Sequence, residues 1–287
     1  MKHINQRRGA AITAVVFAVS MLLSTATAFA SGNQGYLALG ADLSDSEKAT
    51  VLDLMDVSNP DDYNVITVTN SEEHKYLDSY ISSSEIGTKA LSSVLIKENG
   101  GNDIHVETQN INYCTTGMYR NALATAGVSG ADVTVAGPFE ISGTAALVGT
   151  IKAYEQMSGE TVSDDVIESS VDELTTTGQV GEDIGDTEKA EAIIASVKED
   201  MAENPDMSDS EIEESIQEAA QQADVDISDE NVEEISEMLQ NLQDSDIDWD
   251  NVREQSKSIM ENFKGIFDSD EAKGLFARFI AWLKSLL

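Results

Sequence analysis

The sequence predicts an α+β protein, with an N-terminal sheet domain of ferredoxin-like order (β-α-β-β-α-β) followed by an acidic all-α helical region. In the first half, β-branched runs alternate with segments of helical spacing. From residue 160 the helical spacing continues without strand-like runs, and 32 acidic residues stand against four basic ones up to residue 258. We therefore expect an α+β domain over residues 31–159, an acidic helical region over 160–258 and an amphipathic C-terminal helical segment over 259–287.

Residues 1–30 are predicted to be a cleavable signal peptide. Three basic residues precede an apolar stretch over residues 10–23, which is shorter than the ~20 apolar residues that a spanning helix needs. Small residues predict cleavage after Ala30, with Ala28 as the second choice. We expect a secreted protein without an intramolecular disulfide, since Cys114 is its one cysteine.

The first elements of the sheet domain are predicted from their caps. Residues 31–40 are Gly-rich and are expected to be loose, and the capping box SDSE at Ser44 begins a helix. Residues 64–69 alternate like a strand. Asn70 is expected to cap the next helix, with Glu73 at position N3.

A hairpin is expected next. Residues 90–97 and 104–113 read as strands, and Asn99-Gly100-Gly101-Asn102 between them favours a tight turn, because glycine accepts positive φ. On the second strand His105 and Glu107 share one polar face.

Two helices and a strand complete the domain. Thr115 or Thr116 is expected to cap a helix, and a strand from Val133 should end at the Gly137-Pro138 break. Ser142 is expected to cap a slim helix that closes the sheet domain.

The acidic region is predicted to be an array of amphipathic helices rather than a disordered tail. Each apolar stripe follows a capping residue, and acidic residues crowd the first turns, where the helix dipole favours them. The expected caps are Ser163, Thr187, Ser208 and Ser228.

The charge of the chain and its C-terminal segment limit which partners it can bind. The chain has 17 basic and 53 acidic residues, a net charge of −36, which argues against nucleic acid and anionic membrane surfaces. Residues 270–287 carry a broad apolar helical face. We expect it to pack on the chain's own helices; docking on a protein partner and self-association are the alternatives.

Few residues of the sequence are candidates for catalysis. His74 and His105 are the imidazoles of the mature chain, and a Cys–His nucleophile would have to bring Cys114 beside one of them. We expect instead a buried thiol and two solvent-facing histidines, and we assign no catalytic residue and no cofactor.

Alternating aspartates over residues 244–250 resemble the first half of a calcium loop. Trp249 stands where that loop needs glycine, and Gln255 stands where it needs a bidentate glutamate. We therefore expect a polar helix connection and assign no metal ligand.

Several local sequences together resemble a known family. They are VITVTNSEEHKYLDSYI (65–81), GTKALSSVLI (87–96), NALATAGV (121–128) and GPFEISGTAAL (137–147), with a looser match at ELTTTGQVGEDIGD (173–186). They resemble a YpuA-like family of predicted secreted proteins of unknown function from Gram-positive bacteria. The resemblance supports export and a two-part architecture, and it implies no activity, cofactor or site residue.

We therefore expect an exported, non-enzymatic binding or scaffolding protein of the Gram-positive cell envelope. The alternatives are an envelope enzyme that uses the polar sheet face around His105 and Glu107, and an acidic cation-binding protein.

Overall fold

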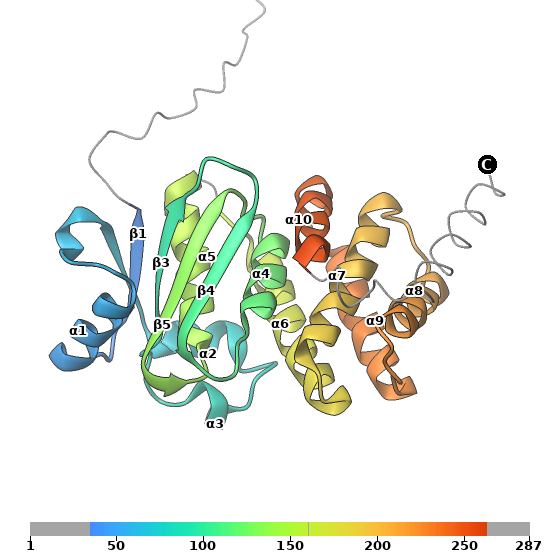
Figure 1. The fold of residues 1–287 in the computed structure, drawn as a ribbon, viewed down its shortest axis with the longest axis horizontal. Coiled ribbons are helices and arrows are strands. Elements are labelled where there is room, and N and C mark those ends of the chain that lie inside the picture. Colours follow the sequence, from blue (N-terminus) through green and yellow to red (C-terminus); the bar gives the residue numbers. More distant parts are fainter. Residues whose placement is uncertain (1–34, 160, 263–287) are drawn as a thin grey trace, which may run out of the picture. The chain divides into compact units, whose positions relative to one another are not determined.

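The computed structural model describes residues 35–159 and 161–262, which form a mixed α+β fold (Figure 1). The strands are β1 Tyr36–Gly40, β2 Asn64–Val68, β3 Ser93–Glu98, β4 Ile104–Ile111 and β5 Ala131–Ile141. The helices are α1 Asp45–Leu54, α2 Asn70–Leu77, α3 Ser83–Ile86, α4 Thr116–Thr125, α5 Thr144–Ser158, α6 Asp164–Ile184, α7 Thr187–Glu203, α8 Asp209–Gln222, α9 Asp229–Asp244 and α10 Trp249–Asn262, with a 3₁₀ turn η1 at Pro60–Asp62. The predicted export signal and the apolar segment 270–287 lie outside the described residues.

The sheet has the strand order β2-β1-β3-β5-β4, so the predicted ferredoxin-like order is wrong. β3 and β4 do not pair with each other; β5 lies between them, antiparallel to β3 and parallel to β4. At the other end, β1 pairs in parallel with β2 and antiparallel with β3. The physical reason is that β5 is apolar enough to be central, with Val133 and Val135 fully buried.

The glycine-rich turn after β3 crosses the start of β5 instead of closing a hairpin. Asn99 N–H donates to Gly130 O, and Gly130 N–H donates to Asn102 O, each at 3.0 Å. Gly130 has φ +58°, and a Cβ there would lie 2.5 Å from the carbonyl oxygen of Gly101. β3 and β4 are therefore separated by β5, which lies between them.

The expectation that residues 31–40 are loose is wrong for β1, which begins at Tyr36. Leu37 and Leu39 face one side of the sheet and Ala38 faces the other, and all three are buried. A strand buried on both faces loses the polar alternation that marks a strand in sequence.

Helices cover both faces of the sheet. On one face Val51 of α1 and its C-cap residue Met55 belong to one buried cluster with Leu37 and Leu95. On the other face α5 lies close to the strands, since a Cβ at Gly149 would lie 3.1 Å from that of Ala38. The slim side chains expected in α5 therefore serve close helix–sheet packing.

β5 continues through Gly137-Pro138, where a break was expected. Its pairing with β3 ends at Ala136, while its pairing with β4 resumes at Ile141 after an irregularity near Asn110, which has φ 56°. Pro138 therefore lies in the irregular stretch of β5 where neither β3 nor β4 is in register with it, and its missing N–H is tolerated there.

The caps of the acidic helices agree with the sequence at three of four positions. Ser163, Ser208 and Ser228 are N-caps, whereas the N-cap of α7 is Asp186, whose carboxylate accepts the N–H of Lys189. The expected cap Thr187 is instead the first residue of the helix, since an aspartate directly before it caps equally well.

α6 joins the helical region to the sheet. Its Val171 and Leu174 belong to the same buried cluster as the sheet residues, while Val180 belongs to the cluster formed with α7, α8 and α9. Both clusters therefore share one continuous helix, beside α4 (Figure 1).

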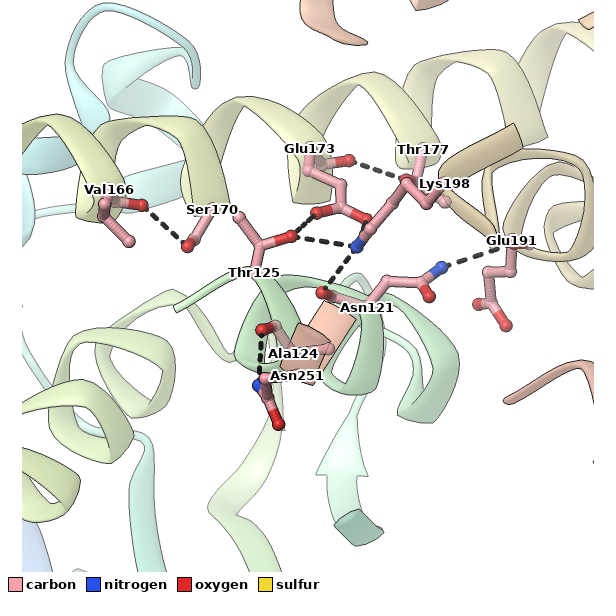
Figure 2. A network of polar contacts seen from close by, with 10 residues as sticks. All are labelled: Asn121, Ala124, Thr125, Val166, Ser170, Glu173, Thr177, Glu191, Lys198 and Asn251. Atoms are coloured by element: carbon pink, nitrogen blue, oxygen red, sulfur yellow. Dashed lines mark hydrogen bonds and ion pairs between the residues drawn. The ribbon is translucent and has the colours of Figure 1, made fainter. Parts of the chain in front are cut away.

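A buried ion pair links three helices (Figure 2). Lys198 Nζ of α7 lies 2.6 Å from Glu173 Oε1 of α6, and both side chains are 0% exposed. The same ammonium donates to Thr125 Oγ1 at 2.9 Å and to the carbonyl oxygen of Asn121 at 3.1 Å, both on α4. The Thr125 hydroxyl in turn donates to Glu173. All three ammonium donors are used, so the buried charge is fully partnered.

This pair predicts a strongly non-additive mutational series. Lys198→Met should lower the free energy of unfolding by about 3–5 kcal/mol, because Glu173 would be left buried without its counter-charge. Lys198→Met combined with Glu173→Met should recover most of that loss in urea unfolding. The exposed Lys257→Met is the control and should be near neutral. Additive losses in the double variant would show that the pair is not coupled.

Candidate functional site

A cavity of about 250 Å³ lies where α2, the segment between α3 and β3, and the first turn of α5 meet. Its polar wall contains the carboxyl group of Glu73 and the hydroxyl groups of Ser92, Ser142 and Thr144. These residues come from three separate places in the chain, so the cavity exists only in the folded protein.

Glu73 reaches the cavity because the cap of α2 differs by one residue from the expected one. Thr69 is the N-cap, and its hydroxyl accepts the N–H of Glu72 while the Glu72 carboxylate accepts the N–H of Thr69. Asn70 is therefore the first helical residue. Glu73, freed from capping, turns inward and is 1% exposed.

The Glu73 carboxyl group is held by two donors. The Thr144 hydroxyl donates to Oε1 at 3.0 Å, and the Asn70 amide donates to Oε2 at 3.2 Å. Burial raises the pKa of Glu73 from its ordinary value of 4.5 to about 7, although the two donors and the nearby His74 lower it and Asp42 raises it further. Glu73 therefore titrates near neutral pH.

The N-terminus of α5 opens on this cavity without the expected serine cap. Gly143 is the N-cap, with φ +96°, and no side chain at that position caps the helix. Ser92 from the other side of the cavity accepts the Ala146 N–H at 2.9 Å. Tyr119 of α4 donates to the Gly143 carbonyl oxygen, and a Cβ at Gly143 would lie 2.6 Å from the Tyr119 hydroxyl. Glycine is required here by both the backbone and the space.

The remaining wall is mixed in character. Ile86, Leu91 and Ile141 supply apolar surface, and Thr88 and Lys89 are exposed residues of the lining. The cavity thus combines a buried acid, an exposed amine, hydroxyl groups and an uncapped helix N-terminus. Such a set can orient a small polar ligand by hydrogen bonds and charge.

The structure does not bring the sequence's candidate residues together. His74 donates through Nδ1 to the Asp78 carboxylate at 2.5 Å and through Nε2 to the Gly87 carbonyl oxygen at 3.2 Å. Its pKa is raised, chiefly by the hydrogen bond to Asp78. Its ring is therefore held between two neighbours next to the cavity.

His105 and Glu107 lie exposed on β4, opposite Asp132 and Thr134 of β5. They share a face, as expected, but two residues along a strand are about 6.6 Å apart, beyond direct hydrogen bonding. The thiol of Cys114 is buried, and burial raises its pKa to about 12, so it stays protonated.

The aspartates of residues 244–250 extend from the last residue of α9, across the connection, into the first turn of α10. Asp248 accepts the N–H groups of Asp250 and Asn251, which caps the start of α10, and Asp250 pairs with Arg253 at 2.8 Å. Two of these carboxylates thus serve the helix N-terminus. Over the described ranges, no group of three or more His, Cys, Asp or Glu side chains is arranged to hold a metal ion.

Within the same part of the chain, no helix has both the length and the apolarity needed to cross a membrane.

Sequence reasoning missed Glu73 as a site residue because it satisfied a plausible capping box. A signal was present: Glu73 lies four residues before Leu77 and eight before Ile81, so it stands in line with the buried stripe. The same holds for Glu173 in α6, which lies seven residues after buried Val166 and seven before buried Val180. An acid in register with an apolar stripe indicates a buried carboxyl group.

Fold and cavity together define an α+β protein with a small, acid-containing cavity at the N-terminus of a buried helix. The chain belongs to the DUF1002 family, described as "Protein of unknown function", whose model matches residues 39–259. It is similar to "Uncharacterized protein YpuA" of Bacillus subtilis (strain 168), with 50% identity over 190 residues. The alignment covers 65% of this chain and 64% of that protein, less than two thirds of its length. No solved structure matches the chain.

The buried acid predicts a pH-dependent stability. Glu73 holds its proton more tightly in the folded state (pKa about 7) than in the unfolded state (4.5), so its contribution is complete below pH 4.5 and is lost as pH rises through 7. Between pH 5 and pH 8 the wild type should lose roughly 3 kcal/mol in free energy of unfolding relative to Glu73→Gln, whose side chain does not titrate. The exposed Glu140→Gln is the control, and parallel pH curves for Glu73→Gln and wild type would contradict the assignment.

Proposed function

We propose that this protein is an exported, non-enzymatic binding protein of the Gram-positive cell envelope and that its ligand enters the Glu73 cavity. The observation that carries the proposal is the buried Glu73 carboxyl group on the cavity wall, fixed by Thr144 and Asn70. Buried acids are costly, and they are common where a protein recognises a ligand or performs chemistry.

Binding is preferred to catalysis because of what surrounds this acid. Among the described lining residues Glu73 is the single carboxylate, whereas glycoside hydrolysis uses a pair. The alternative on the sheet, His105 and Glu107, lies on an exposed strand face, and in the described part of the chain no hydrogen bond joins His105 to Asp132, its neighbour on β5, so the imidazole is not oriented for catalysis.

A second candidate function follows from one hydrogen bond. The Thr144 hydroxyl donates to Glu73 at 3.0 Å beside the N-terminus of α5, which is the arrangement of a hydroxyl nucleophile, a base and an oxyanion site. An envelope hydrolase would use Thr144 in this way. Thr144→Val would abolish turnover in an enzyme, while in a binding protein it would only weaken affinity.

Two further parts of the proposal concern the chain ends. Export with removal of residues 1–30 would place the acidic body outside the cell, where 53 acidic against 14 basic residues give it a net charge of −39 that keeps it soluble. The apolar segment 270–287 would pack on the protein or dock on a protein partner or a second copy; truncation before Asp270 separates these by melting temperature and by oligomeric state.

The proposal predicts both a processed N-terminus and a cavity-dependent interaction. Protein secreted from a Gram-positive host should begin at Ser31, or at Phe29, by N-terminal sequencing. Its retention on washed cell-wall material should fall several-fold in Thr88→Trp, which places a large ring on the cavity lining. Thr50→Trp, exposed on α1, is the matched control. An intact Met1 on membranes would reject export, and unchanged retention of Thr88→Trp would reject the cavity.

A further inference from the structure

The Glu73 cavity is bipolar. Its lining contains one carboxyl group, Glu73, and one amine, Lys89, and within residues 35–159 and 161–262 no ion pair joins the two. Lys89 is exposed, with Glu47 as a neighbouring charge, and Glu73 is buried. A site with opposite charges that do not neutralise each other suits a ligand that carries both charges.

The acid has room for a cationic partner. A carboxylate offers about four acceptor positions, and Thr144 and Asn70 use one on each oxygen of Glu73. Both donors are neutral, and the nearby His74 ring is hydrogen-bonded to Asp78 and Gly87 instead of to Glu73, so no cationic group among the described residues is hydrogen-bonded to this desolvated carboxylate. An ammonium group would restore the missing charge, and the strongly acidic body of the protein favours the entry of cations.

The opposite wall suits a carboxylate. α5 is 15 residues long, and at its N-terminus Gly143 provides no side-chain cap, while Ser92 satisfies only the Ala146 N–H. The first-turn amides of such a helix attract anions, and Lys89 adds a positive charge on the same lining. Ile86 and Ile141 supply apolar surface for an aliphatic group.

The size of the cavity limits the ligand. At about 250 Å³ it is smaller than the roughly 300–1,000 Å³ of pockets that hold drug-sized molecules. A ligand with few heavy atoms, an ammonium group and a carboxylate group close together satisfies size and charge at once.

We propose that the Glu73 cavity binds a free amino acid with a small aliphatic side chain, its ammonium group on Glu73 and its carboxylate between Lys89 and the N-terminus of α5. This inference rests on the proposed function and names the ligand class of the same site.

Binding should be linked to the protonation of Glu73. With its pKa near 7, about half of the free protein carries a proton on this carboxyl group at pH 7, and an ammonium ligand selects the ionised form. His74, Asp42, Lys89 and Tyr119 are the titratable or charged neighbours whose fields act on this equilibrium. Affinity should therefore rise from pH 6 to pH 8, and about half a proton should be released per ligand at pH 7.

Calorimetry on the secreted protein tests the inference with three probes: L-valine, N-acetyl-L-valine, which lacks the ammonium group, and L-valinamide, which lacks the carboxylate. We expect valine to bind, N-acetylvaline to bind at least about tenfold more weakly, and Glu73→Gln to lose valine by a similar factor. Lys89→Gln should weaken the binding of L-valine but not that of L-valinamide. Because Lys89 is exposed, this variant should fold normally. Lys48→Gln, exposed on α1, is the control and should change neither.

Heats measured in buffers of different ionisation enthalpy give the number of protons released per ligand bound. If Glu73 has only a structural role, this number should be zero. If N-acetylvaline binds as tightly as valine, the site takes anions and the inference is overturned. If no probe binds while Thr88→Trp still lowers cell-wall retention, the ligand class is wrong and the proposed function stands. If no probe binds and Thr88→Trp has no effect, both fail.

Discussion

The helices of this protein are arranged around one requirement, that the charges of Lys198 and Glu173 stay paired inside the molecule. Both side chains are fully buried, and their partners come from α4 through Thr125 and the Asn121 carbonyl group. A buried charge without its partner is far more costly than a neutral substitute. α4, α6 and α7 must therefore keep one relative position, which fixes the acidic helices against the sheet side of the molecule (Figure 2).

α4 also connects the helices of the buried ion pair to the cavity. At its N-terminus it receives the Glu191 carboxylate of α7, which is bound by the Thr115 hydroxyl, and Gly117 leaves the space, since a Cβ there would lie 1.7 Å from Glu191 Oε2. Further along the same helix, Tyr119 holds the Gly143 carbonyl group at the start of α5. A continuous set of contacts thus leads from the acidic helices to the cavity wall, so the position of Glu73's partner Thr144 depends on both halves.

Carboxylates divide into two populations in this chain. Most lie on the surface, where they determine the net charge of −36. A few are buried or half-buried beside hydroxyl groups, and desolvation raises their pKa: Glu73 to about 7 with Thr144, Asp200 to about 6 with Ser215, and Glu191 above its ordinary value with Thr115. Hydroxyl donors stabilise an ionised acid without neutralising it. Of these three, Glu73 is the one that lines the cavity described above, and there a ligand can supply the missing charge.

The sequence by itself determined the α+β class, the capping box at Ser44, a cap at Thr115 or Thr116 and the amphipathic acidic helices, because periodicity and capping act over a few residues. Only the tertiary structure decided the sheet order, since the choice of neighbour for β5 depends on packing between distant segments. It also decided the site. One residue of difference in the cap of α2 turned Glu73 from a surface cap into a buried acid, and Thr144, 71 residues later, completed its hydrogen bonds. Local patterns cannot report a contact whose two partners are brought together by the core.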